Sequence, residues 1–241
     1  MIIEIKNRVD YLKVLFLSDI HGNYAALEAV WLHMQKHKAD IVLCAGDLVS
    51  FGPRPAEVVE FIRKKEIQSI LGNHEAVIAG IVSTKDFIFK DDAERDYINN
   101  SISRTLDFLD SGHIDYIKSL HYDIVSPEHR LIMTHSVPDM FTYPDMDSMN
   151  SFMRGRAERF LFYGHTHRPG VYTLENGKIA VNLPAVGKPK HGDYLAGYCV
   201  VEIASGKLRG LEFCFVDYDV QFVRKEITDR GFPKETLQFL L

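Results

Sequence analysis

Eight side chains that can bind metal ions or transfer protons follow short apolar runs at five separate places in the sequence. Aspartate, asparagine and histidine offer oxygen and imidazole nitrogen, a ligand set that suits manganese, iron, zinc or magnesium. The three cysteines are far apart and never form a Cys-x-x-Cys pair, so thiolate ligation is not indicated. The eight residues are Asp19, His21, Asp47, Asn73, His74, His135, His165 and His167.

The number of candidate ligands favours two metal ions over one. Without His74, seven residues remain, whereas a catalytic zinc ion typically takes only three protein ligands. Two ions that share one carboxylate fit the set better, and a pair roughly 3.5 to 4 Å apart is a recognised clamp for in-line attack on phosphorus. His74 follows Asn73 directly and is free to donate a proton to a leaving group or to stabilise phosphoryl charge.

Short apolar runs predict the strands that position these residues. Runs at 14–17, 41–45 and 69–71 alternate with helical periodicity at 23–38 and 58–62, an order typical of a parallel sheet. Two later runs, at 131–133 and 160–163, each precede a histidine motif. Because the carboxyl ends of strands line the ligand crevice of an open α/β sheet, we expect these distant side chains to converge.

The rest of the chain predicts a second, largely antiparallel half. Runs at 171–174 and 178–181 flank an Asn-Gly turn, which indicates a hairpin, and the runs at 198–203 and 211–215 are expected to extend this half. Residues 76–121 have mixed charge and helical periodicity, and predict a helical insertion that either covers the site or only packs against it. We find no linker, so residues 1–241 are expected to form a single domain, with 1–13 an added edge strand or an upstream start.

Composition excludes several classes of protein. The chain has 241 residues, 46% of them hydrophobic and 25% charged, which is ordinary for a globular protein. Its net charge of -5 argues against nucleic acid as a partner. No apolar stretch is long enough to cross a bilayer, and no signal peptide is evident, so we expect a cytoplasmic protein without a membrane partner.

Five ordered sequence blocks resemble those of the calcineurin-like metallophosphoesterase superfamily. They are Asp19-Ile20-His21, Gly46-Asp47, Gly72-Asn73-His74-Glu75, Thr134-His135 and Gly164-His165-Thr166-His167. The flanking residues resemble its small prokaryotic phosphoesterase branch, which is sometimes called diadenosine tetraphosphatase-like. The resemblance runs from about residue 14 to the chain end, with a closing strand at 218–220. It implies an α/β fold, namely a two-sheet β-sandwich flanked by helices in four αββα layers.

The same resemblance implies how the ligands are shared and where the sequence departs from relatives. One ion would be held by Asp19, His21, Asp47 and His167, and the other by Asp47, Asn73, His135 and His165. In protein serine/threonine phosphatases of the superfamily an aspartate and an arginine follow the second block, but here Ser50 and Phe51 take those places. Phosphate contacts must therefore come from other residues. The candidates are Asn23, Arg54, Arg168, Lys188 and Lys190.

These observations predict a dinuclear metal-dependent phosphoesterase that acts on a small phosphate ester or nucleotide. A metal-bound hydroxide would attack phosphorus in a diester or a monoester without a phosphoenzyme, and His74 would assist the leaving group. Manganese or iron is the favoured metal, with zinc, magnesium or nickel as alternatives. Two other functions stay open: a non-enzymatic metal-binding interaction module on the same fold, as in a retromer subunit of the superfamily, and a nuclease. The sequence leaves the oligomeric state undetermined.

Overall fold

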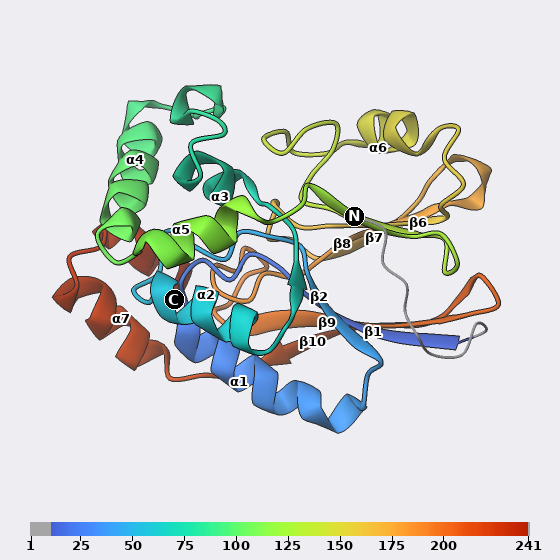
Figure 1. Ribbon diagram of the computed structural model, residues 1–241, viewed down its shortest axis with the longest axis horizontal. Helices are drawn as coiled ribbons and strands as arrows, with labels where there is room; N and C mark the ends of the chain where they lie inside the picture. The colour runs from blue at the N-terminus through green and yellow to red at the C-terminus, as the bar shows by residue number, and fades with distance from the viewer. Residues whose placement is uncertain (1–10, 241) are drawn as a thin grey trace.

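Two five-stranded β-sheets pack face to face, and helices cover the outer face of each (Figure 1). The computed structural model describes residues 11–240. The layers therefore follow the order helix, sheet, sheet, helix, which confirms the expected four-layer α/β sandwich. In the described residues, no helix is long and apolar enough to cross a membrane.

The first sheet has a parallel centre and an antiparallel edge. Strand β1 pairs in parallel with β2, as β2 does with β3, whereas β9 runs antiparallel to β1 on its other side. The sequence pattern predicts that β9 and β10 extend the second half of the sandwich. This prediction is wrong, because both strands belong to the first sheet. An apolar run predicts a strand but does not say which partner its backbone will find. In sheet order the strands are β10 (Lys207–Val216), β9 (Ala196–Ala204), β1 (Tyr11–Leu17), β2 (Ile41–Cys44) and β3 (Gln68–Ser69).

The second sheet is mixed rather than largely antiparallel. Its three inner strands are parallel, and only β4 and β7 at the edges run antiparallel to their neighbours. The predicted hairpin is confirmed as β7 and β8, joined through a short turn in which Asn176 and Gly177 both have positive φ. In sheet order the strands are β4 (Asp123–Ser126), β5 (Leu131–Thr134), β6 (Phe160–Tyr163), β8 (Ile179–Asn182) and β7 (Gly170–Thr173).

Three apolar clusters hold the layers together. Between the sheets, the rings of Phe16 and Phe162 stack with centroids 4.3 Å apart, and both side chains are fully buried. Helix α1 contacts β9 and β10 on the outer face of the first sheet, and Met149 and Met153 of α6 pack on the outer face of the second. Because residues 14–17 of β1 and the whole of β6 are buried on both faces, they appear in the sequence as unbroken apolar runs.

Seven α-helices surround the sheets within the described residues. The helix expected from residue 23 begins with Asn23 as its N-cap, and Pro55 occupies the first turn of the next helix. In Figure 1, helices α3, α4 and α5 lie together on the left, and α6 lies above the second sheet. The helices are α1 (Tyr24–Met34), α2 (Pro55–Lys64), α3 (Asn73–Ile78), α4 (Asp92–Leu106), α5 (Ser111–Lys118), α6 (Met146–Met153) and α7 (Val220–Asp229).

Two predictions near the chain ends need correction. Residues 218–220 do not form a closing strand, because the Asp219 carboxylate accepts a hydrogen bond from the Phe222 N–H and starts α7. Residues 11–13 belong to β1, which lies between β9 and β2 and is not at an edge. The remainder of the segment 1–13 lies outside the described residues.

Candidate metal centre

The candidate ligands converge where strands of both sheets end. Two groups of ligand atoms, each within 4.8 Å of one another, could each hold a metal ion, and both groups include Asp47. The first group contains Asp19, His21, Asp47 and His167, and the second contains Asp47, His135 and His165. The amide oxygen of Asn73, at the start of α3, lies beside the second group.

The backbone at this centre is held in a strained conformation. Five candidate ligands have φ between 49° and 67°, in the left-handed region that non-glycine residues rarely adopt. Strain of this kind costs on the order of 1 to 3 kcal/mol per residue and typically persists at functional sites. The five residues are Asp19, His21, Asp47, His165 and His167.

Ring hydrogen bonds orient each of the four histidines among the candidate ligands. Nδ1 of His21 lies 3.1 Å from the Val49 carbonyl oxygen, and His135 and His167 make the same kind of contact with the Ala45 and Lys188 carbonyls at 2.7 and 2.6 Å. These three rings therefore donate through Nδ1 and turn Nε2 toward the centre. His165 uses Nε2 instead, on the Phe141 carbonyl at 3.1 Å, and turns Nδ1 inward. A histidine that binds a metal typically donates its other ring N–H in this way.

In the first group, two imidazole lone pairs face each other. Burial lowers the pKa of both His21 and His167 well below the usual value, so both rings are neutral. Their Nε2 atoms are only 3.1 Å apart, and neither carries a proton, because each ring already donates through Nδ1. The Asp19 carboxylate lies 3.2 Å from Nε2 of His167. Such a set of acceptors repels itself unless a cation lies among them, so the residues fit a divalent metal ion.

The second group contains a histidine whose charge responds to Asp47. Nε2 of His135 lies 3.4 Å from the Asp47 carboxylate and 2.9 Å from Oδ1 of Asn73, which is also 3.2 Å from Nδ1 of His165. Burial lowers the pKa of His135, but the negative charge of Asp47 has the larger combined effect and raises the pKa of His135 to about 10. The strong pull of the Asp47 carboxylate on a positive charge at this position fits a site for a cation.

Glu75 fixes the loops that carry Asp47 and Asn73. This fully buried carboxylate accepts hydrogen bonds from the backbone N–H groups of Asp47, Val49 and Gly72 at 2.7, 3.0 and 3.0 Å. Burial, together with the charge of Asp47, raises the pKa of Glu75 to about 8. The side chain therefore acts as a brace between the end of β2 and the start of α3 rather than as a group open to substrate.

His74 lies on the wall of the pocket that contains the candidate ligands. Its ring packs edge-on against His21 and Phe51, with centroids 5.2 and 4.7 Å away. Burial lowers the pKa of His74 to about 4, and the charge of Lys188 contributes to this shift. Among the described residues Nδ1 of His74 has no hydrogen-bond partner. Ser50 and Phe51 stand where an orienting aspartate and an arginine occur in the protein phosphatases, and packing against Phe51 holds the ring here.

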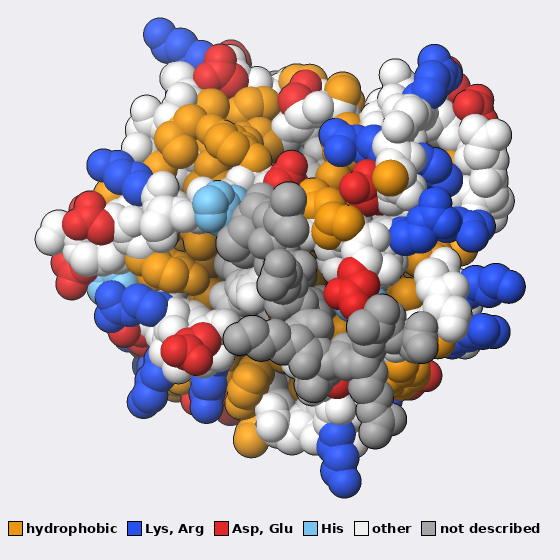
Figure 2. All heavy atoms as spheres, turned by 45° about the vertical axis from the view of Figure 1, so that its right-hand side comes forward, with side chains coloured by type: hydrophobic (Ala, Val, Ile, Leu, Met, Phe, Trp, Pro, Cys, Tyr) orange, Lys and Arg blue, Asp and Glu red, His pale blue; other side chains and the backbone are white. Residues whose placement is uncertain are grey.

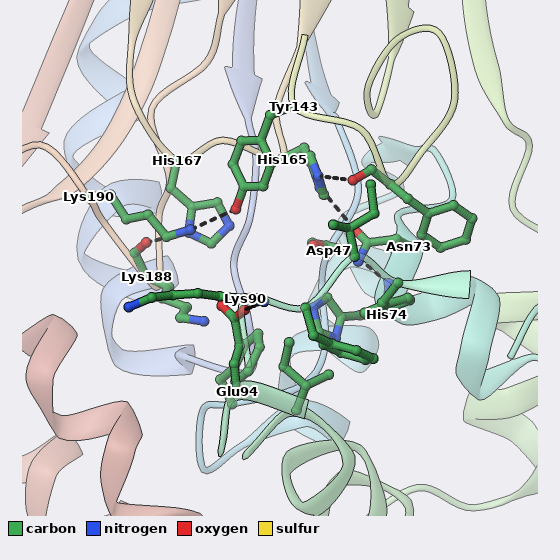
Figure 3. A pocket seen from close by; sticks show the side chains of 16 residues that line it. Asp47, Asn73, His74, Lys90, Glu94, Tyr143, His165, His167, Lys188 and Lys190 are labelled. Atoms are coloured by element: carbon green, nitrogen blue, oxygen red, sulfur yellow. Dashed lines mark hydrogen bonds between the residues drawn. The ribbon is translucent and has the colours of Figure 1, made fainter. Parts of the chain in front are cut away.

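The metal pocket, as we name this cavity, has a volume of about 360 Å³. Figure 3 shows Asp47, Asn73 and His74 on one side of it and Lys188 and Lys190 on the other. The insertion predicted at 76–121 contributes directly to the wall, through residues 87–90 and Glu94 and Ile98. Aromatic rings of Phe87, Phe141 and Tyr143 complete an apolar side.

Lys188 and Lys190 are the predicted substrate-binding residues that line the metal pocket, and Lys188 is the more deeply buried of the two. The contacts of Lys188 are with aromatic rings. Its ammonium lies 3.3 Å from the ring centroid of Phe51 and 4.5 Å from that of Phe239, and only 7% of the residue is exposed. Burial lowers its pKa well below the usual value, and nearby Lys190 adds to this effect. Within residues 11–240, no carboxylate pairs with this ammonium.

The three remaining candidates, Asn23, Arg54 and Arg168, do not line the metal pocket. Asn23 caps α1 and donates from Nδ2 to the Gly187 carbonyl and the Tyr218 hydroxyl, so the fold uses its polar atoms. Arg54 directs its guanidinium away from the pocket, toward Glu226, with two contacts of 2.7 Å. Arg168 is exposed and lines a neighbouring cavity that it shares with Lys190.

Sequence reasoning overlooked the aromatic side of the pocket and the brace at Glu75. Phe87, Phe89, Phe141 and Tyr143 lie in two short segments with no regular period, so nothing in their spacing indicates a shared wall. Phe87 and Phe89, on either side of Ile88, were the sequence feature that could have indicated this wall. Apolar residues grouped in an otherwise polar insertion often mark a binding surface.

The chain belongs to the calcineurin-like phosphoesterase family, whose model matches residues 12–169. It is 28% identical to an uncharacterised protein of Methanocaldococcus jannaschii over 92% of this chain and 94% of that protein. It is 33% identical to a symmetrical bis(5'-nucleosyl)-tetraphosphatase of Buchnera aphidicola, but that match covers only 50% of this chain and 43% of the relative.

A solved structure supports the fold. The crystal structure of a metallophosphoesterase from Sphaerobacter thermophilus has a TM-score of 0.74 and 24% sequence identity, and the match covers 96% of this chain and 98% of that one. Family membership and the candidate ligand groups together support a metal-binding hydrolase of the phosphoesterase type.

Proposed function

We propose that this protein is a dinuclear-metal phosphoesterase that hydrolyses small phosphate esters, including nucleotide-derived ones. The observation that carries the proposal is the pair of ligand groups joined by Asp47, in which the unprotonated Nε2 atoms of His21 and His167 face each other. One ion would be held by Asp19, His21, Asp47 and His167, and the other by Asp47, Asn73, His135 and His165.

Two divalent ions held by these residues would supply an acidified water molecule and would neutralise the charge of the phosphoryl oxygens. Hydrolysis then joins a water oxygen to phosphorus while the bond to the leaving oxygen breaks, with no covalent bond to the protein. His74 lies beside the ligands and provides the proton that the leaving oxygen needs. An anionic phosphate next to this ring raises its pKa and so favours its protonated form.

Phe51 stands in place of the arginine of the protein phosphatases and cannot bind phosphate. Lys188 provides that contact instead. A buried ammonium without a carboxylate partner is costly, and a phosphoryl oxygen would satisfy both its charge and its hydrogen bonds. The ring of Phe51 supports this role, because its face stabilises the ammonium directly above it.

The shape and charge of the protein favour a small substrate. A volume of about 360 Å³ lies near the lower end of the range for ligand pockets, roughly 300 to 1,000 Å³. The net charge of -5 does not favour a long polyanion as substrate, although several lysine and arginine side chains gather on the right of the face seen in Figure 2. The name of the Buchnera relatives makes a dinucleoside polyphosphate one candidate within this class.

A substrate panel tests the proposed function. Protein stripped of metal by chelation is expected to lack activity, and about two equivalents of manganese or iron are expected to restore hydrolysis of bis(p-nitrophenyl) phosphate. Metal content measured by inductively coupled plasma mass spectrometry checks the stoichiometry. If the reloaded protein holds two ions but hydrolyses none of the aryl monoesters, aryl diesters or diadenosine polyphosphates, the non-enzymatic alternative is favoured instead.

Replacing Lys188 with glutamine is expected to lower kcat/KM for the aryl diester by roughly 10- to 100-fold, the value of one charge-assisted hydrogen bond. Metal content is expected to stay at two ions. The melting temperature of the metal-free protein is not expected to fall, because the substitution removes an unpaired buried charge. Lys207→Gln, at an exposed position on β10, is the matched control. An unchanged kcat/KM in Lys188→Gln would exclude this contact.

A further inference from the structure

A second cavity of about 320 Å³ adjoins the metal pocket, and we name it the side cavity. Tyr143 and Lys190 line both cavities and form their common wall, with Nζ of Lys190 donating a 3.1 Å hydrogen bond to the Tyr143 hydroxyl. Thr166 also lines the side cavity, and it stands between His165 and His167 in the sequence. The two cavities therefore flank the same segment of candidate metal ligands.

A residue that lines the side cavity has a buried acceptor without a partner among the described residues. Asn182, at the end of β8, is 2% exposed, and its Nδ2 donates to the Thr166 hydroxyl. Its Oδ1 has no hydrogen-bond partner among the described residues. An amide oxygen buried without a donor costs about 1 to 3 kcal/mol, so a ligand that brings an N–H or O–H group would satisfy it.

Two cationic side chains and two aromatic rings complete the side cavity. Arg168 is exposed, and within residues 11–240 its guanidinium has no carboxylate or carbonyl partner. Lys190 adds a second positive charge from the common wall. The phenol rings of Tyr143 and Tyr172, 58% and 36% exposed, offer flat surfaces on which a planar ring can stack. Cations, stacking surfaces and a hydrogen-bond acceptor together match an anionic group that carries a heteroaromatic ring.

We infer that the side cavity binds the non-reacting half of a two-part phosphate ester, and that this half is nucleotide-like. The inference rests on the proposed function, because the reacting phosphorus must lie at the metal pocket. The metal pocket, of about 360 Å³, takes one organic group and the reacting phosphate. The side cavity, of about 320 Å³, takes the second organic group on the other side of Tyr143 and Lys190. Diesters and polyphosphates with two organic groups are therefore better substrates than monoesters.

Two substrates that share a chromophore test this inference. In manganese-loaded protein, kcat/KM is measured for bis(p-nitrophenyl) phosphate and for the p-nitrophenyl ester of thymidine 5'-monophosphate, which adds a heteroaromatic ring with an N–H donor. The kcat/KM for the nucleotide ester, divided by that for the aryl diester, is expected to fall about tenfold or more in Arg168→Ala, because one charge-assisted contact is lost. Arg168→Lys should restore part of the ratio. Arg209→Ala, an exposed arginine on β10, is the matched control.

A binding measurement separates failure of this inference from failure of the proposed function. By titration calorimetry, Arg168→Ala is expected to weaken binding of thymidine 5'-monophosphate about tenfold more than binding of inorganic phosphate. If the wild-type protein hydrolyses neither ester and no other substrate of the panel, the proposed function fails, and the calorimetry still decides whether the side cavity binds a nucleotide. If both esters are hydrolysed but neither the kcat/KM ratio nor the affinity ratio changes in Arg168→Ala, the side cavity does not bind the second half.

Discussion

Replacing Asp47 with asparagine is expected to remove at least one metal ion and to lower turnover by roughly a thousandfold or more, because metal-assisted charge stabilisation contributes several kcal/mol. The Asp47 carboxylate lies 3.6 Å from Nε2 of His21 and 3.4 Å from Nε2 of His135, so it belongs to both ligand groups. Loss of its charge weakens both sites at once. Asparagine tolerates the positive φ of 54° at this position. Backbone strain is therefore not an added cause of the expected loss of metal and turnover.

Metal content and turnover are measured together for Asp47→Asn. After equilibrium dialysis the wild-type protein should retain about two ions per chain, and the variant one or none. Asp147→Asn, an exposed aspartate in the first turn of α6, is the matched control and should retain both ions. A variant that keeps two ions and near wild-type turnover would refute the bridging role of Asp47.

Replacing His74 with alanine is expected to lower turnover by about a hundredfold or more while metal content stays at two ions. The ring lies beside His21 but does not belong to either ligand group, so its loss should leave both groups intact. If His74 protonates the leaving oxygen, the loss is larger for an alkyl leaving group than for p-nitrophenolate, because the alkoxide is the stronger base.

The leaving-group comparison distinguishes proton donation from a structural role of His74. A cavity left by the ring, or a shift of Phe51 and Phe87 around it, would slow both substrates equally. His121→Ala, which removes an exposed imidazole, is the matched control. Loss of metal from His74→Ala would show instead that the residue supports the ligands.

The strand ends that carry the candidate ligands could be predicted because burial determines their sequence pattern. A strand covered on both faces must be apolar throughout, and the first polar residue after it marks the point where the chain leaves the sheet. At β1 the first polar residue is Ser18, directly before Asp19, and after the buried Ala45 the first charged residue is Asp47. Sheet membership could not be predicted in the same way, because β9 pairs with β1 through backbone groups that every residue possesses.

The five predicted substrate-binding side chains show where local pattern stops being informative. Arg54 and Lys188 are both cations in loops near the centre, but Arg54 meets Glu226, 172 positions away, whereas Lys188 meets aromatic rings. A long cationic side chain takes the direction in which a partner lies, and that partner is supplied by another element. Asn23 likewise finds Gly187 and Tyr218, which are remote in the sequence.

By itself, the sequence determined the family blocks, the ligand types and the helices and strands that carry them, because hydrophobic periodicity and residue chemistry act locally. The tertiary structure decided which nitrogen each histidine turns inward, which cation reaches the pocket, and how the insertion at 76–121 contributes to its wall. These features depend on contacts between residues far apart along the chain. Such contacts are fixed only when the two sheets pack and the buried polar groups must find partners.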